Sequence, residues 1–223
     1  MIGSKPRFLD RLPLALIYYN MKKLILLILI TSLISCTKDD DGTDSSLPAI
    51  TSEGKNTFGC KINGETFLPK SKGGFSLGPR NLLSAKYAYY EYEHYGLEPG
   101  YHLFIRANNQ LTNKSVGIML SGSDTPLMVG DTYPITLKSE GSLSAEYFFS
   151  TNTQSAENPN IYIHNSFQHF TTNEYKGEIT FHHIDEENQI ISGEFYFDCI
   201  DTENNETAEI TEGRFDLIYE AYF

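Results

Sequence analysis

The residues that come closest to a catalytic pattern lie in a glycine-rich stretch. Residues 74–78 (GFSLG) match the G-x-S-x-G nucleophile elbow, in which Ser76 would be the nucleophile. The elbow needs a strand before the serine and a helix after it, so that the serine sits on a strained turn. Residues 79–81 (PRN) follow here, without a helix-forming run. The stretch therefore indicates a glycine-rich loop, with a serine hydrolase as the alternative.

Two other clusters have side chains that could bind a metal ion. His182 and His183 are adjacent, and because neighbouring strand residues point to opposite faces, they cannot share one ion. The acidic turn with Asp198, Asp201 and Glu203 has the oxygen ligands that Ca²⁺ prefers. A solvated acidic hairpin explains the same residues without a ligand. Calcium at this turn is therefore the alternative, and no other cofactor is expected.

A tyrosine-rich stretch is a candidate for a ligand-binding face. Tyrosine exposes an apolar ring and a hydroxyl, which suits stacking on a sugar or contact with a protein. The same residue type is common on half-buried strands, so packing is the default interpretation. The residues concerned are Tyr87, Tyr89, Tyr90, Tyr92 and Tyr95.

Strands must position these residues, because apolar and polar residues alternate with a period of two after residue 53 and helical spacing is absent. Strands are predicted over 58–62, 66–68, 87–95, 101–107, 115–120, 132–137, 143–151, 178–184, 190–200 and 207–219. About ten short strands separated by turns predict an all-β domain, an antiparallel β-sandwich with a barrel-like fold as the alternative. A polar loop is predicted over 152–160, with His164 and His169 near a loop.

Ahead of this domain, residues 21–36 have the zones of a secretory signal peptide. Two lysines form the positive zone, an apolar run covers 24–34, and the small residue Ser35 precedes Cys36. The apolar run has only 11 residues, whereas a membrane-spanning helix needs about 20. Residues 33–36 (LISC) resemble the bacterial lipobox, which implies that Cys36 is acylated and becomes the first residue of the mature chain.

The residues after Cys36 are polar and indicate a flexible tether. Lys38, Asp39 and Asp40 resemble the export signal that sends lipoproteins of Bacteroidota to the outer face of the outer membrane. A solvated linker fits the same composition. The predicted parts of the chain are an over-called start (1–20), the signal peptide (21–35), the lipidated Cys36 with its tether (36–52) and one all-β domain (53–223).

The charge of the chain restricts its partners. It has 29 Asp and Glu residues against 17 Lys and Arg, a formal net charge of −12. An acidic surface repels the phosphates of nucleic acids, which argues against nucleic acid as a partner. It also disfavours anionic lipid headgroups, so attachment to a membrane must come from acyl chains.

Two further cysteines, Cys60 and Cys199, share strand parity with large apolar residues and should face the core. In an oxidising compartment such a pair can form a disulfide. The bond would require the first strand to lie beside the penultimate one, with Cα atoms about 6 Å apart. Two buried free thiols are the alternative.

Three segments carry a family resemblance: 57–65 (TFGCKINGE), 191–197 (ISGEFYF) and 210–216 (ITEGRFD) resemble a group of uncharacterised Bacteroidota lipoproteins. The resemblance implies an anchored, extracytoplasmic all-β domain and supplies no catalytic residue. The sequence thus predicts an outer-membrane lipoprotein at the cell surface that is a non-catalytic binding module for a glycan or protein ligand. The alternatives are an accessory subunit of an envelope complex, with the tyrosine-rich strand as its interface, and a hydrolase.

Overall fold

The structure is a computed structural model that describes residues 46–73, 82–94, 96–158 and 160–222. They belong to one compact unit, Ser45–Phe223. Among these residues, none forms a helix long and apolar enough to cross a membrane. The predicted lipidation and export residues (Cys36, Lys38, Asp39 and Asp40), Ser76 and Tyr95 lie outside the described residues.

The described chain forms eleven β-strands, which confirms the all-β prediction. The strands are β1 (Thr57–Ile62), β2 (Glu65–Phe67), β3 (Leu83–Tyr90), β4 (Gly100–Asn109), β5 (Lys114–Ser123), β6 (Thr132–Ile135), β7 (Leu143–Gln154), β8 (Tyr162–Phe170), β9 (Gly177–Asp185), β10 (Ile190–Asp201) and β11 (Glu206–Ile218).

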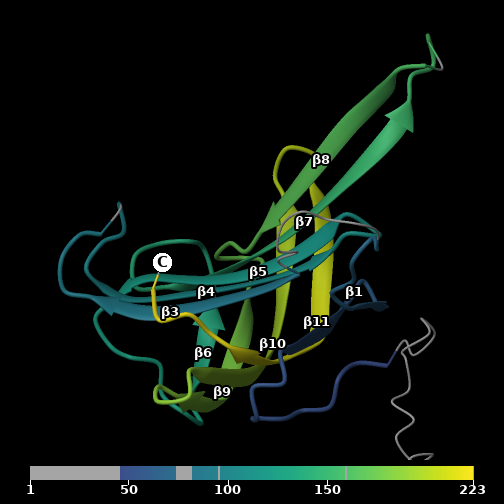
Figure 1. The fold of residues 1–223 in the computed structure, drawn as a ribbon. Helices are drawn as coiled ribbons and strands as arrows, with labels where there is room; N and C mark the ends of the chain where they lie inside the picture. The colour runs from purple at the N-terminus through teal and green to yellow at the C-terminus, as the bar shows by residue number, and fades with distance from the viewer. Residues whose placement is uncertain (1–45, 74–81, 95, 159, 223) are drawn as a thin grey trace, which may run out of the picture. The chain divides into compact units, whose positions relative to one another are not determined.

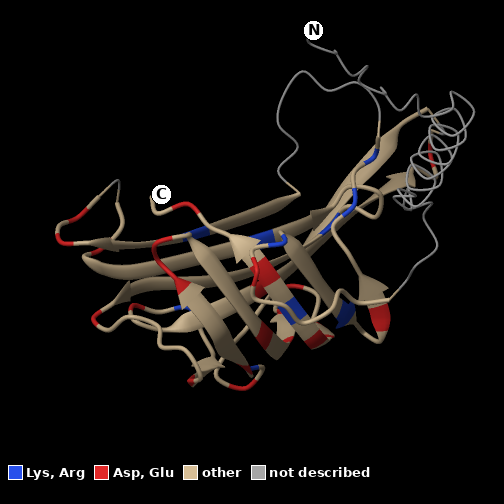
Figure 2. Cartoon of the chain, turned by 60° about the horizontal axis from the view of Figure 1, so that its bottom comes forward, with Lys and Arg blue, Asp and Glu red and all other residues tan. Residues whose placement is uncertain are grey.

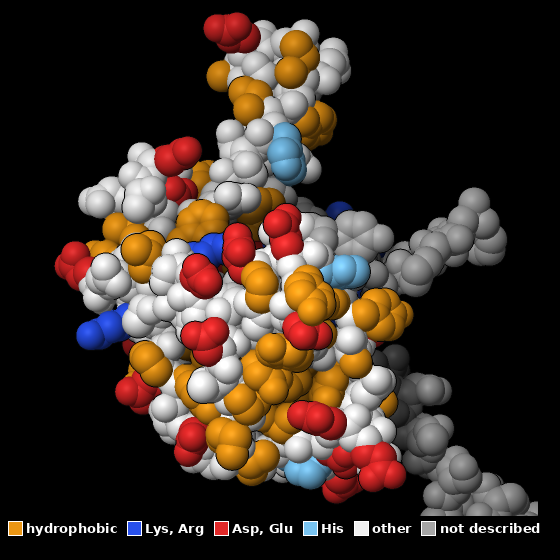
Figure 3. All heavy atoms as spheres, turned by 90° about the vertical axis from the view of Figure 1, so that its left-hand side faces the viewer, with side chains coloured by type: hydrophobic (Ala, Val, Ile, Leu, Met, Phe, Trp, Pro, Cys, Tyr) orange, Lys and Arg blue, Asp and Glu red, His pale blue; other side chains and the backbone are white. Residues whose placement is uncertain are grey.

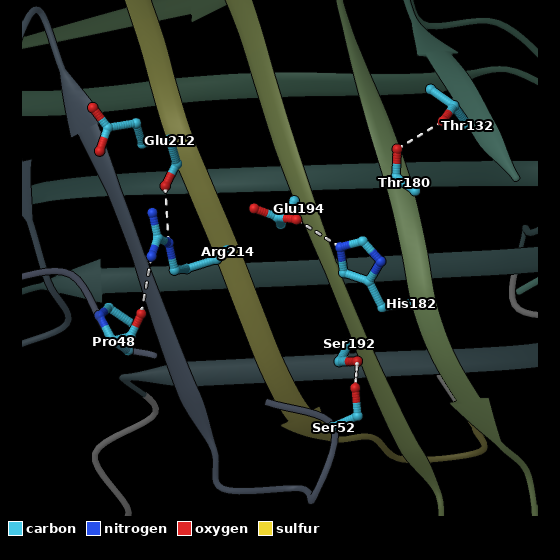
Figure 4. Close-up of polar contacts among 9 residues, drawn as sticks. All are labelled: Pro48, Ser52, Thr132, Thr180, His182, Ser192, Glu194, Glu212 and Arg214. Carbon is cyan, nitrogen blue, oxygen red and sulfur yellow. Dashed lines mark hydrogen bonds and ion pairs between the residues drawn. The ribbon is translucent and has the colours of Figure 1, made fainter. Parts of the chain in front are cut away.

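All eleven strands belong to one sheet that folds into two facing layers (Figure 1). The first layer contains β3, β4, β5 and β7, and the second contains β1, β11, β10, β9 and β6, whose strands cross those of the first (Figure 4). β7 connects the layers because it pairs with β5 and, in parallel, with β6, where Leu143 lies opposite Ile135. The sandwich-like prediction is confirmed, but the two layers are continuous and the sheet is mixed.

The core lies between the layers and follows the alternation seen in the sequence. Phe197 and Cys199 of β10 and Leu217 of β11 are buried in the second layer, as their strand parity predicted. Ile105 of β4 and Ile118 of β5 are buried in the first layer and belong to the same cluster. Burial of such apolar side chains is the main favourable contribution to folding.

The sequence prediction missed β8. The predicted loop over 152–160 is shorter than expected, because β7 continues to Gln154 and β8 begins at Tyr162. β7 and β8 form a hairpin that extends beyond the two layers, which we call the arm (Figure 1). His164 and His169, expected near a loop, lie within β8. Both faces of the arm carry polar residues, so the half-buried alternation that identifies a strand is missing there.

The two cysteines of the domain face the core, but they are free thiols. β1 pairs with β11 and not with β10, so one strand separates Cys60 from Cys199. The strand neighbourhood that a disulfide requires is therefore not formed, and two buried thiols are found instead. Burial raises the pKa of Cys199 to about 12 and also raises the pKa of Cys60, so both thiols are unreactive at neutral pH.

One buried carboxylate ties the N-terminal segment to β11. Asp216 accepts hydrogen bonds from Thr51 Oγ1 (2.6 Å) and from the N–H groups of Glu53 (3.0 Å), Gly54 (2.7 Å) and Lys55 (3.3 Å). Burial raises the pKa of Asp216, but these hydrogen bonds outweigh it and the pKa lies below its ordinary value. The folded unit therefore begins before residue 53, where the domain boundary was predicted.

We expect Asp216→Asn to lower the free energy of unfolding by about 3 kcal/mol at pH 7, because buried N–H donors lose a charged acceptor. The contribution of Asp216 is present above the pKa of an unfolded aspartate, about 3.9, and is lost as the pH falls below that value. Urea unfolding at pH 7 and pH 3 measures both effects. Asp198→Asn, at an exposed position of β10, is the control. Equal urea midpoints for wild type and D216N at pH 7 would contradict this role.

Candidate functional site

Three adjoining cavities form a groove on the outer face of the first layer. Their volumes are about 440 Å³, 270 Å³ and 270 Å³. The first and second cavities share Ser115 and Phe148, and the second and third share Gln168, so the three lie next to one another. We call this row of three cavities the outer groove.

The outer groove is lined mainly by side chains that both donate and accept hydrogen bonds. Its amides are Asn108, Asn109, Gln110, Asn113 and Gln168, and its hydroxyls are Ser115, Ser150, Ser166 and Thr202. Two phenylalanines add apolar surface: Phe148 is half-buried, and Phe170 is 43% exposed. The lining therefore combines many polar groups with two aromatic rings.

The strand register explains why these side chains gather. Asn108 of β4 lies opposite Ser115 of β5, Ser115 opposite Phe148 of β7, and Phe148 opposite Gln168 of β8. Residues directly opposite each other share one face of a sheet. On β4, β5 and β7, a residue adjacent to the member of this row belongs to the core. Because adjacent residues of a strand point to opposite faces, the row itself lies on the outer face. Four strands thus contribute one residue each to the floor of the groove.

A second row carries an ion pair across the groove. Arg106 of β4 and Glu146 of β7 form the pair, and Gly117 of β5 lies between them in the register. A Cβ atom at Gly117 would lie 3.1 Å from the Glu146 side chain, so glycine makes room for the pair. The Arg106 guanidinium also lies 5.4 Å from the centre of the Phe104 ring. Its Nε is buried and has no hydrogen-bond partner among the described residues.

The ends of the outer groove differ in charge. Lys72 and Lys114 line the first cavity, and Asp201 and Glu203 line the third. Lys114 also lies 3.7 Å from a carboxylate oxygen of Glu65. Figure 2 shows several of the few Lys and Arg positions of this acidic chain near the base of the arm. The groove therefore runs from a cationic to an anionic end.

The acidic turn at the third cavity is stabilised by its own residues. Asp201 Oδ1 accepts hydrogen bonds from the N–H groups of Glu203 (2.9 Å) and Asn204 (3.3 Å), and Oδ2 from the Asn204 amide (2.8 Å). The hydrogen bond from the Asn204 side chain has the largest effect on the pKa of Asp201 and lowers it, and the two backbone hydrogen bonds lower it further. Asp198 is exposed on β10. The described residues contain no group of three or more His, Cys, Asp or Glu side chains that could hold a metal.

The predicted tyrosine face is not one surface. Tyr87 is buried, and its hydroxyl accepts a hydrogen bond from the Leu127 N–H (3.0 Å). Tyr89 is 56% exposed, but β3 ends at Tyr90, so Tyr92 lies beyond the strand although the prediction placed it within one. Tyr87 therefore packs into the core, and the exposed rings are distributed along an edge and the turn after it.

The outer face of the second layer carries pairs of polar side chains (Figure 4). His182 Nε2 lies 2.7 Å from Glu194 Oε2, while His183 lies 4.0 Å from Asp185 Oδ2, so the two histidines have separate partners. Other pairs on this face are Ser52 with Ser192 (2.8 Å) and Thr132 with Thr180 (2.7 Å). Arg214 donates to the carbonyl oxygens of Pro48 and Glu212. These contacts satisfy one another across neighbouring strands, so this face is better explained by sheet stability than by ligand binding.

Comparison with known protein families gives one match. The family described as Domain of unknown function (DUF6252) matches residues 101–218, which is more than half of the chain. The chain belongs to the DUF6252 family. No curated protein and no solved structure gives a significant match. The match to the DUF6252 family covers nearly all of β4 and every later strand, and so includes most of the outer groove and the arm.

Apart from Asp201 and Glu203, the prediction from sequence did not identify the groove residues of this DUF6252 protein. One signal was available: Ser115 and Phe148 occupy the non-core parity of two predicted strands, and Asn108 directly follows a third. The order of the strands was not, and without it these positions cannot be recognised as neighbours. Gln168 was missed because β8 was missed.

Beneath the groove, His169 is buried at the base of the arm. It is 2% exposed, and its ring lies 5.4 Å from Tyr147 and 5.9 Å from Phe149. Its Nδ1 has no hydrogen-bond partner among the described residues. Burial lowers the pKa of His169, and the opposing effects of Asp201 and Glu206 are smaller. The neutral imidazole is therefore the form that the fold accommodates.

We expect acid to destabilise the fold through His169. Because its pKa is lower in the folded state, the unfolded chain binds a proton first, and the free energy of unfolding falls as the pH drops below about 6.5. His169→Phe should reduce this slope between pH 6.5 and 5, measured by urea unfolding at several pH values. His164→Gln, at an exposed position of the same strand, is the control. An unchanged slope in H169F would contradict the assignment.

Proposed function

We propose that this DUF6252 protein is a lipid-anchored, non-catalytic binding module of the bacterial cell surface, and that it binds a glycan in the outer groove. The observation that carries the proposal is the groove itself. It is a long hollow with amides, hydroxyls and two aromatic rings on the outer face of a continuous sheet.

The chemistry of the lining fits a sugar chain. A sugar hydroxyl both donates and accepts hydrogen bonds, and so does each Asn or Gln amide. The rings of Phe148 and Phe170 offer apolar surface to the C–H face of a pyranose. Arg106 contributes a buried Nε–H without a protein partner, and such groups are rare unless a ligand or water satisfies them. Three adjoining cavities suit an oligosaccharide better than a single small molecule.

The carboxylates of the groove support binding more than hydrolysis. Glu146 is paired with Arg106, and Asp201 accepts the hydrogen bonds that close its turn. Glycoside hydrolysis requires one carboxylic acid and one carboxylate placed on either side of the scissile bond. Glu146 and Asp201 already have structural partners, so a binding module is the better explanation.

The location rests on the sequence of residues 21–40. A short apolar run, the lipobox-like residues before Cys36, and the export-like Lys38, Asp39 and Asp40 support a diacylated lipoprotein on the outer face of the outer membrane, as in Bacteroidota.

Glycan binding is tested with the full chain on a glycan array, followed by thermal unfolding with each positive glycan. At about 100 times its dissociation constant, a ligand adds about 2.7 kcal/mol to stability. Phe148→Ala should weaken binding at least about tenfold, which corresponds to about 1.4 kcal/mol. Tyr196→Ala, which removes a ring that is 49% exposed on the other layer, should leave affinity unchanged. Equal affinities of F148A and wild type would refute the groove as the site.

Anchoring is tested in cells by labelling with a palmitate analogue. The wild-type chain should carry the label and be cleaved by protease added to intact cells, because a surface lipoprotein is both acylated and accessible. Cys36→Ser should lose the label. A triple alanine variant at Lys38, Asp39 and Asp40 should keep the label and lose the accessibility, while Ser45→Ala with Ser46→Ala changes neither. Persistent labelling of C36S would contradict lipidation at this cysteine.

A further inference from the structure

The outer edge of β8 is unpaired along most of its length. β8 pairs with β7 from Tyr162 to Phe170, whereas its contact with β10 is limited to Phe170 opposite Ile200. From Tyr162 to His169, no other strand of the described residues pairs with the outer edge, although the turn after β10 approaches Ser166 and Gln168 across the third cavity. An edge of eight residues is long enough to pair with another strand.

The printed hydrogen bonds of the arm identify which backbone groups face this edge. In an antiparallel pair, residues that exchange both hydrogen bonds alternate with residues that exchange none. Ser155 N–H donates to Ile161 O, and Thr171 N–H donates to Ala145 O, so the odd-numbered residues of β8 bond to β7. The even-numbered residues therefore direct their N–H and C=O groups outward: Tyr162, His164, Ser166 and Gln168.

Other edges of the sheet are protected. The C-terminal segment covers the edge of β3, where Tyr87 N–H donates to Glu220 O and Glu220 N–H to Ala85 O. β2, at the opposite end, has only three residues and includes the exposed Glu65. Proteins commonly shield edges by such covering, shortness or charge. The outer edge of β8 is neither short nor charged, and the turn after β10 approaches it near its base.

The edge of β8 is also uncharged. From 162 to 169 there is no Asp, Glu, Lys or Arg, and Tyr162 and Ile163 are 66% and 48% exposed. Figure 3 shows hydrophobic and histidine side chains along the arm and an acidic side chain at its tip, and further acidic side chains are spread over the body below it. Two copies of a chain with net charge −12 repel each other over most of their surfaces, and an uncharged edge avoids that repulsion.

We propose that two copies of this chain associate by antiparallel pairing of β8 with β8 of the second copy. An antiparallel edge is complementary to itself, as a twofold-symmetric interface requires. The register that pairs all four outward residues sets Tyr162 opposite Gln168 of the second copy and His164 opposite Ser166. Asn165 then lies opposite Asn165 of the second copy. The two residues form a pair without hydrogen bonds, in which the Cα atoms are about 4.5 Å apart.

The pairing has a consequence for the groove. Because the twofold axis is perpendicular to the sheet, the outer faces of both copies lie on the same side. Both outer grooves then face one ligand, which increases avidity without a new contact. This consequence rests on the proposed function, whereas the pairing itself does not.

Cysteine cross-linking of the full chain in cells tests the register. Asn165→Cys should give a disulfide-linked dimer under mild oxidation, because the Cα separation fits a disulfide. Ile163→Cys is the matched control. It lies on the same face as Asn165, but residue 163 of one copy is about 13 Å from residue 163 of the other along the strands. Cys60 and Cys199 are buried and do not compete. A dimer with N165C and none with I163C supports the proposal; no dimer, or equal dimers, overturns it.

The molar mass of the detergent-solubilised full chain, from light scattering with the detergent subtracted, tests the edge separately. Wild type should give twice the mass of one chain. Ser166→Pro removes an N–H group that points outward and leaves the hydrogen bonds to β7 in place, so this variant should have the mass of one chain. His164→Lys sets like charges near the twofold axis and should also have the mass of one chain. Ser166→Ala should remain a dimer. A monomeric wild type, or a dimer that persists in both S166P and H164K, overturns the proposal.

Discussion

Much of this structure depends on the pairing of β7, because no other strand serves the core, the groove and the arm together. Its first residues are buried and join the two layers through β5 and β6. Its middle residues place Glu146 and Phe148 in the outer groove. Its last residues leave the body and pair with β8. A shift of one residue in this register would move Phe148 into the core and Tyr147 out of it, since side chains alternate between faces.

Buried polar groups are accommodated in two different ways. Asp216 has four hydrogen-bond donors around one carboxylate, which keeps it ionised although it is buried and fastens the N-terminal segment to β11. His169 lies among aromatic rings without a described partner for Nδ1, so only its neutral form is tolerated. The first arrangement stabilises the fold over most of the pH range, while the second makes the base of the arm sensitive to mild acid.

The match to the DUF6252 family places the outer groove and the arm largely within one family domain. Residues 101–218 include four of the strands that bear the groove, the turn after β10 and both strands of the arm. β1, β2 and β3 precede the matched region and complete the sheet at its two ends. The proposed glycan site and the proposed self-pairing edge thus both lie largely in the part of the chain that the family model matches.

The sequence by itself determined the local features of this protein. Alternation with a period of two predicted an all-β domain, and strand parity predicted that Cys60 and Cys199 face the core. Asn63 and Gly64 are residue types that tolerate positive φ, and they form a turn with φ values of 50° and 81°. These features depend on a few consecutive residues, so a single chain segment contains the information.

Only the tertiary structure decided which strands are neighbours. It placed β11 between Cys60 and Cys199, brought Asn108, Phe148 and Gln168 into one groove, and dispersed the tyrosines that are close in sequence. It also revealed β8, whose residues are too polar on both faces for periodicity to identify a strand. The physical reason is that pairing between distant strands depends on the packing of the whole core, and local alternation contains no record of it.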